Sequence, residues 1–273
     1  MLKRFMMCGL LLTAAACSSE AEIPGQSPMA SLNQITSEQW QALAQRTVYF
    51  GHQSVGADIM DGVREIAAEY PQITLRVVSG KPAAAAGVLN EFAIGKNNDL
   101  DSKNAAFLSA TQGSLGAKPV LMFKYCFVDV DIGTDVKTVF DHYQQTIAAL
   151  KAQHPDAVLV HVTMPLVSDS RVRNYINSVL GRPTRVMRNA LRARYNAMLR
   201  SAYVKEPIFD LEAVESTRAD GKREYAILDG QTVFSLAQEW TTDGGHLNAM
   251  GRRRAAEQLL VTLAALSDSG IRR

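Results

Sequence analysis

The chain has 273 residues, of which 47% are hydrophobic and 21% are charged, so its composition is that of a globular protein and its length that of one large domain. Its 29 basic and 27 acidic residues give a formal net charge of +2. A charge this small gives no reason to expect a nucleic-acid or other polyanionic partner.

The first 17 residues have the pattern of an export signal. Lys3 and Arg4 precede an apolar run at residues 5–12, which is too short to span a bilayer, and small residues follow up to Cys17. A cysteine after three alanines resembles the lipobox of bacterial lipoproteins, although Ala14 stands where a leucine is more usual. The pattern predicts export to the periplasm or cell envelope and membrane attachment through a lipid on Cys17. Cleavage by ordinary signal peptidase and a retained anchor are the alternatives.

Residues 18–35 are rich in Ser, Pro, Gly, Glu and Gln and predict a flexible tether. We expect a single domain at residues 36–267 and a short tail at 268–273. Cys126 is the only thiol in that domain, so no intrachain disulfide can form there. Because Cys126 lies in an apolar run, we expect a buried structural thiol rather than a catalytic one.

Within the domain, strand-like apolar runs alternate with amphipathic helical stretches, which predicts an α/β fold with a largely parallel sheet. Strands are expected at residues 47–51, 73–79, 119–127, 157–164 and 208–211. Helices are expected at residues 55–69, 136–153, 185–203 and 248–266. The loops at 79–93 and 168–183 are expected to determine substrate specificity.

Ser54 falls on the turn between the first strand and the first helix, where ligands bind in open α/β sheets. Backbone N–H groups and the helix dipole could stabilise an oxyanion there. The alternative is that Ser54 only caps the helix, because serine is a preferred N-cap residue.

Near the other end of the chain, Asp243 and His246 lie three residues apart on a turn before the last helix. An aspartate at that spacing can accept a hydrogen bond from the imidazole Nδ1 while Nε2 faces a nucleophile. Capping and solvation of the turn are the alternative.

Together, Gly51-His-Gln-Ser54 and Asp243-Gly-Gly-His246 resemble the blocks of the SGNH/GDSL hydrolase family, and the resemblance spans residues 47–266. It implies a flavodoxin-like three-layer α/β/α sandwich with a five-stranded parallel sheet. It also implies that Ser54 is the nucleophile, His246 the general base and then acid, and Asp243 the residue that orients His246.

Two departures from the family pattern affect the oxyanion hole and the substrate contacts. The usual Gly-Asp-Ser is Gly-His-Gln-Ser here, and Cys126-Phe-Val-Asp129 lacks the asparagine of the usual Gly-x-Asn-Asp block. We therefore expect the Ser54 N–H, Gly95 and Asn97 to form the oxyanion hole, with an ordinary Asn/Gly-rich turn as the alternative. Asp129 could orient that loop or simply end its strand.

His52 and Gln53, just before the serine, are expected to contact the substrate. His52 could instead pack beneath the turn or serve as another base. Residues two apart on an extended strand face the same side, so His52 and Ser54 would then be neighbours on one surface.

We expect no cofactor, because no phosphate loop or G-x-G-x-x-G pattern is present, and no metal. Asp129-Val-Asp-Ile-Gly-Thr-Asp135 only superficially resembles a calcium loop. An arginine-rich helix at residues 185–203 could meet anionic lipid or an acidic glycan, or be a solvated face.

The sequence thus predicts an exported serine esterase acting on a carboxylic ester, such as an acylated or acetylated glycan or another small ester. A non-catalytic carbohydrate-binding envelope protein and an O-acyltransferase with the same triad remain alternatives, and the oligomeric state is open.

Overall fold

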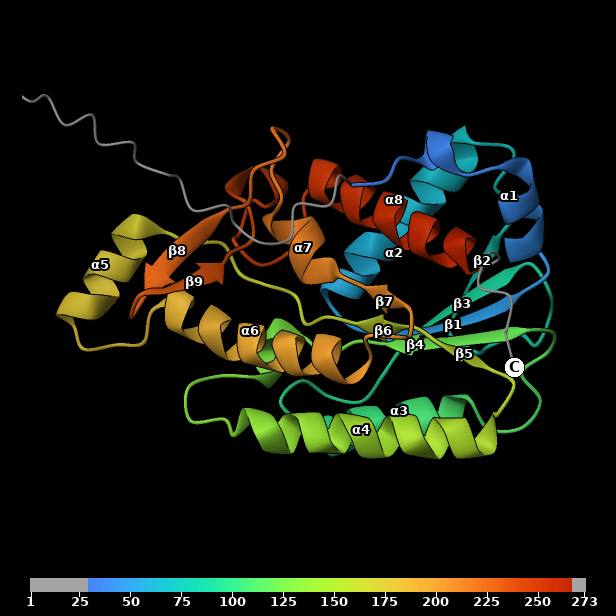
Figure 1. Cartoon of the computed structure of the whole chain (residues 1–273), viewed down its shortest axis with the longest axis horizontal. Coiled ribbons are helices and arrows are strands. Elements are labelled where there is room, and N and C mark those ends of the chain that lie inside the picture. The colour runs from blue at the N-terminus through green and yellow to red at the C-terminus, as the bar shows by residue number, and fades with distance from the viewer. Residues whose placement is uncertain (1–28, 267–273) are drawn as a thin grey trace, which may run out of the picture.

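A computed structural model describes residues 29–266, and a five-stranded parallel sheet lies at their centre (Figure 1). The strand order is β2-β3-β1-β4-β5, and each pair of neighbours is parallel. The strands are β1 (Thr47–His52), β2 (Arg76–Ser79), β3 (Val88–Ala93), β4 (Pro119–Phe123) and β5 (Val158–Leu159). The predicted α/β fold with a five-stranded parallel sheet is confirmed.

Helices cover both faces of this sheet, which makes a three-layer α/β/α sandwich (Figure 1). One face carries α1 (Ser37–Leu43), α2 (Val55–Glu69), α7 (Leu211–Ser216) and α8 (Ala249–Ala265). The other carries α3 (Leu100–Ala110), α4 (Val136–Gln153) and α6 (Arg185–Ala202). The remaining helices are α5 (Arg171–Val179) and the 3₁₀ turns η1 (Leu32–Gln34), η2 (Phe127–Asp129) and η3 (Gln238–Trp240).

The central strand β1 supplies both layers of the core, because successive side chains of a strand point to opposite faces. Val48 and Phe50 pack with α2 and α8, whereas Tyr49 packs with α3 and α4. All six residues of β1 are buried, as expected for a parallel strand covered on both sides.

The sheet differs from the expectation in one member. Residues 88–93, expected to be part of a loop, form β3 beside β1. The strand expected at 208–211 is β7 (Ile208–Phe209), which pairs outside the main sheet with β6 (His161–Val162). The hairpin of β8 (Tyr225–Leu228) and β9 (Gln231–Phe234) was also not expected.

The packed domain begins before residue 36, contrary to the expected extent of the tether. Leu32 is 5% exposed and belongs to the core, and Met29 and Ile35 pack against it. The Gln258 side chain donates a hydrogen bond to the Ala30 carbonyl at 2.6 Å. The expected signal, Cys17, residues 18–28 and the tail at 268–273 lie outside the described residues.

No helix among residues 29–266 is both long and apolar enough to cross a bilayer. Cys126 is 1% exposed and unpaired, as the sequence predicts for a buried structural thiol.

Candidate active site

Ser54 lies at the carboxyl end of β1, on the turn that begins α2. Its φ of 56° and ψ of −119° fall in a region that a residue with a Cβ atom rarely adopts, at a cost on the order of 1–3 kcal/mol. Its side chain forms no capping hydrogen bond with α2. Instead, the Ser54 Oγ lies 2.8 Å from the His246 Nε2. The Ser54 side chain therefore does not cap α2.

His246 is held on its other side by Asp243. Its Nδ1 lies 2.7 Å from the Asp243 Oδ2, and the Asp243 Oδ1 accepts hydrogen bonds from the backbone N–H groups of Gly245 and His246, both at 2.8 Å. The hydrogen bond from His246 is the main reason that the pKa of Asp243 lies well below its usual value. An ionised Asp243 favours the tautomer that carries its proton on Nδ1, which leaves Nε2 free to accept the proton of Ser54.

The turn that carries Asp243 and His246 is tied to the rest of the site by three contacts. The Leu247 N–H donates to the Asp58 Oδ2 at 3.0 Å, which joins this turn to the first turn of α2. The Phe127 ring lies edge-on to the imidazole of His246, with 6.0 Å between centroids. Ser168 donates its N–H to the Gly244 carbonyl at 2.9 Å. The imidazole is thus positioned from three directions while 49% of its surface stays exposed.

Gly244 must be glycine because of its surroundings. It has a φ of +87°, and a Cβ atom there would lie 2.1 Å from the Arg185 Nη1 and 2.7 Å from the Ser168 Oγ. A side chain at Gly244 would therefore strain the turn that holds Asp243 and His246, and the Arg185 and Ser168 side chains would have to move.

The side chains of His52 and Gln53, which were predicted to contact the substrate, each form hydrogen bonds with other parts of the protein. His52 is 4% exposed, and its Nε2 lies 2.7 Å from the Glu91 Oε2. That hydrogen bond is the main reason that the pKa of Glu91 falls to about 2, whereas burial lowers the pKa of His52. A neutral His52 that donates a hydrogen bond to an ionised Glu91 is consistent with both lowered pKa values. His52 therefore packs beneath the turn that carries Ser54. The packing is close, because a Cβ atom on Gly56 would lie 2.4 Å from the His52 Cβ.

Gln53 instead holds the loop that follows β3. Its Nε2 donates to the carbonyls of Ile94, at 2.7 Å, and Gly95. Because β3 pairs with β1, this loop emerges beside Ser54. The Ser54 and Gly95 N–H groups donate no hydrogen bond to any other described residue.

The exposed Asn97 is oriented by a buried ion pair. Its Oδ1 accepts a hydrogen bond from the Lys103 Nζ at 3.0 Å, and Lys103 also pairs with Asp129. Asp129 in turn accepts hydrogen bonds from the N–H groups of Asn98, at 2.8 Å, and Cys126, at 2.6 Å. Asp129 therefore orients the loop after β3, which answers a question that the sequence left open. Because the Asn97 oxygen is bound to Lys103, its Nδ2 is left as the donor.

Three residues that support the site were not predicted from the sequence: Lys103 holds the loop after β3, Glu91 holds the His52 ring, and Phe127 contacts His246. Lys103 lies on a helix that the sequence analysis did not predict, and only its complete burial in the fold makes it stand out.

Among residues 29–266, no group of three or more His, Cys, Asp or Glu side chains could hold a metal ion. In residues 129–135, which superficially resemble a calcium loop, Asp135 caps α4 and Asp131 forms an ion pair with Arg188 at 2.6 Å.

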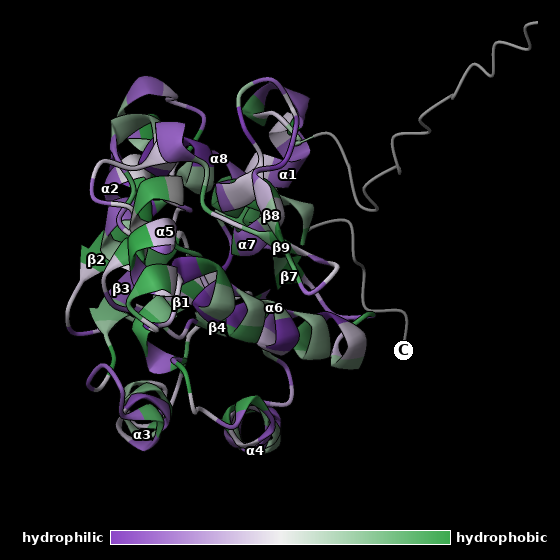
Figure 2. Cartoon of the chain, turned by 90° about the vertical axis from the view of Figure 1, so that its left-hand side faces the viewer, coloured by the Kyte–Doolittle hydropathy of each residue, from purple (hydrophilic) through white to green (hydrophobic). Residues whose placement is uncertain are grey.

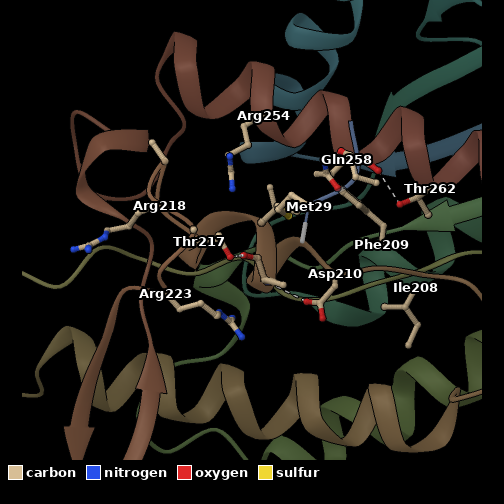
Figure 3. Close-up of a pocket in the computed structure, with 15 residues that line it drawn as sticks. Met29, Ile208, Phe209, Asp210, Thr217, Arg218, Arg223, Arg254, Gln258 and Thr262 are labelled. Atoms are coloured by element: carbon tan, nitrogen blue, oxygen red, sulfur yellow. Dashed lines mark hydrogen bonds between the residues drawn. The ribbon is translucent and has the colours of Figure 1, made fainter. Parts of the chain in front are cut away.

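A cavity of about 770 Å³ lies elsewhere, between α7, α8 and the first described residues (Figure 3). Arg218, Arg223 and Arg254 line it, together with Met29, whereas Ser54, Asp243 and His246 do not. It is therefore separate from the candidate active site.

No family model and no curated protein matches the chain. Among solved structures, it is similar to a protein from Streptococcus pneumonia with the provisional description of a platelet activating factor, at 13% identity and a TM-score of 0.50, over 83% of this chain and 90% of that one. It also matches a lipase/acylhydrolase from Enterococcus faecalis, at 15% identity and a TM-score of 0.48, over 81% of this chain and 96% of that one.

A member of the lipolytic protein G-D-S-L family from Veillonella parvula matches at 13% identity and a TM-score of 0.45, over 84% of this chain and 99% of that one. At these identities, the first of the three similarities supports the fold alone.

Proposed function

We propose that the protein is a serine hydrolase that cleaves carboxylic esters, with Ser54 as the nucleophile. The observation that carries the proposal is the chain of two hydrogen bonds, 2.8 Å and 2.7 Å long, from Ser54 through His246 to Asp243. Nucleophile, base and orienting acid within hydrogen-bond reach of one another are what acyl transfer to a serine requires.

In the first step, the Ser54 Oγ attacks the carbonyl carbon of the ester while the His246 Nε2 takes its proton. His246 then returns the proton to the leaving alcohol as the C–O bond breaks, which leaves Ser54 acylated. In the second step, His246 takes a proton from water and the resulting hydroxide attacks the acyl carbon. His246 then returns the proton to the Ser54 Oγ as the bond between that oxygen and the acyl carbon breaks, which releases the carboxylic acid. Asp243, ionised throughout, stabilises the imidazolium in both steps.

We propose that the Ser54 and Gly95 N–H groups and the Asn97 carboxamide bind the oxyanion of the tetrahedral intermediates. Support comes from the Gln53 contacts, which hold the loop against the serine turn, and from Lys103, which orients Asn97. Donors fixed in advance by buried contacts stabilise developing charge at little reorganisation cost.

The proposal extends to location and substrate. We propose that residues 1–17 direct export, that Cys17 carries a lipid, and that the ester belongs to an acylated or acetylated envelope glycan or another small ester. Support comes from the signal-like composition and the lipobox-like cysteine. Mass spectrometry of the mature N-terminus tests the anchor, because a mature chain that starts after Cys17 would contradict it.

A fluorophosphonate tests the nucleophile, because it labels only serines activated by a neighbouring base. We expect one adduct, on the peptide that contains Ser54. It should be absent from Ser54→Ala and retained in Ser109→Ala, which removes an exposed serine of α3. Labelling of Ser54→Ala equal to that of the natural chain would refute the assignment.

A further inference from the structure

The amphipathic helix α5 turns its apolar side to solvent. Large apolar side chains at positions 172, 175, 176 and 179 follow the spacing of one helical face, and Leu180 continues it. Their exposed fractions are 73% for Val172, 72% for Tyr175, 50% for Ile176, 69% for Val179 and 55% for Leu180. Large apolar side chains gathered on one exposed face are typical of an interaction surface.

Two polar side chains of α5, Asn174 and Asn177, form hydrogen bonds with the segments that flank the helix. Asn174 accepts a hydrogen bond from the Arg185 N–H at 3.2 Å and donates one to Asp169, and Asn177 donates to the Pro183 carbonyl at 3.3 Å. These bonds hold the helix with its apolar face outward. Figure 2 views the molecule from the side on which α5 lies and shows hydrophobic residues along its ribbon.

The charge around α5 indicates the kind of surface that would cover it. Residues 170–205 contain eight arginines and one lysine and no acidic residue. Several of these cations have partners in the fold, such as Arg188 with Asp131 and Arg200 with Asp210. Arg182, two residues after Leu180, is exposed and forms no ion pair with any residue of the described range. An apolar helical face with arginines beside it is typical of helices that lie in the interface of an anionic membrane.

From these observations we propose that α5 docks the protein on a bilayer that contains anionic phospholipid, with the apolar face in the interface and Arg182 among the headgroups. The docked surface adjoins the candidate active site. The residues that flank α5 both contact the Gly244 carbonyl. Ser168, before the helix, donates its backbone N–H at 2.9 Å, and Arg185, after it, donates its Nη1 at 3.4 Å. Docking does not depend on catalysis, so failure of one proposal leaves the other standing.

The length of chain before the described residues is compatible with this location. Met29 is the twelfth residue after Cys17, and a fully extended chain of that length reaches about 40 Å. An attachment at Cys17 would therefore keep Met29 within about 40 Å of the membrane surface.

Cosedimentation with vesicles tests the proposal, using residues 18–273, which retain the whole sheet and both core layers. We expect binding to vesicles of equal parts phosphatidylcholine and phosphatidylglycerol, and much weaker binding to phosphatidylcholine alone. The variant Val172→Ser, Ile176→Ser, Val179→Ser should lose at least about tenfold in affinity, since each change removes apolar burial in the interface. Arg182→Gln should lose about fivefold, and less at high salt.

The matched control is Val204→Ser with Met250→Ser, which removes two apolar side chains that are 77% and 59% exposed elsewhere on the surface. It should bind like the parent, as should Ser54→Ala. If the triple variant does not fold, a fluorescent label on Tyr175→Cys reports on the face directly. Its emission should shift to the blue with anionic vesicles, and Cys126 is too buried to be labelled.

Absence of binding to anionic vesicles, equal binding by the α5 and control variants, or an unshifted label would each overturn the proposal. A dimer in sedimentation velocity that the α5 variant alone abolishes would assign the face to a second copy of the chain, and would likewise overturn it.

Discussion

The Ser54 Oγ and the His246 Nε2 lie 2.8 Å apart although 192 residues separate them along the chain. The fold brings them together because β1 ends, and α2 and α8 begin, at the same edge of the sheet, and these two helices pack against each other. In open α/β sheets, this edge is where ligands bind.

Asp243→Asn should reduce kcat by about a thousandfold or more, because an amide favours the wrong tautomer of His246 and does not stabilise the imidazolium. KM should change little, since Asp243 has no proposed contact with substrate. Steady-state kinetics with a soluble ester measures both. Asp141→Asn, on the exposed side of α4, is the control. A kcat within fivefold of the parent would mean that Asp243 does not orient the base.

Asn97→Ala should lower kcat by about a hundredfold, the typical loss for one oxyanion-hole donor. Lys96→Ala changes the neighbouring exposed side chain and keeps the backbone hydrogen bond from Lys96 to Ser102, so it should keep nearly full activity. Equal kcat values for both variants would remove Asn97 from the oxyanion hole.

Lys103→Met should destabilise the protein by about 3–5 kcal/mol, because it leaves Asp129 buried without its cation. Lys137→Met removes one partner of an exposed pair with Asp141 and should cost about 1 kcal/mol or less. Urea unfolding of both variants gives the comparison. Similar losses would mean that the buried pair is not a main support of the loop after β3.

Glu215 should make the stability of the protein fall with rising pH. It is fully buried, and burial raises its pKa from 4.5 to about 8. Between these values the folded state holds a proton that the unfolded state has lost, so the free energy of unfolding falls by up to about 1.4 kcal/mol per pH unit.

Glu215→Gln should therefore flatten the dependence of unfolding free energy on pH between pH 5 and 8, as urea unfolding at several pH values would measure. Glu239→Gln, at an exposed position, should leave the slope unchanged. A slope for Glu215→Gln equal to that of the parent would contradict the raised pKa.

The sequence predicted the helices best. The patterns at 55–69 and 136–153 match α2 and α4 residue for residue, because long amphipathic stretches carry a strong periodic signal. The strand β3 escaped prediction because the polar Asn90 and Glu91 interrupt its apolar run. In the fold both are satisfied: Asn90 bonds the Val48 and Ala83 carbonyls, and Glu91 bonds His52.

The same limit applies to the site. The sequence indicated Ser54, Asp243 and His246 because each stands at a turn in a recognisable spacing. It could not show that His52 faces inward, since that depends on the partner Glu91 on a strand that was not predicted. The role of Lys103 likewise depends on its contacts. Asn97 lies in the loop after β3, and Asp129 lies 26 residues further along the chain than Lys103.

The most direct test of the account is the release of p-nitrophenol from short-chain esters by residues 18–273, compared with Ser54→Ala and His246→Ala. Starting at residue 18 keeps Leu32 and Ile35, which pack on the core. The account predicts turnover by the parent and a loss of about a thousandfold or more in kcat for each variant. Comparable rates for all three proteins would contradict the assignment of Ser54 and His246 to the chemistry.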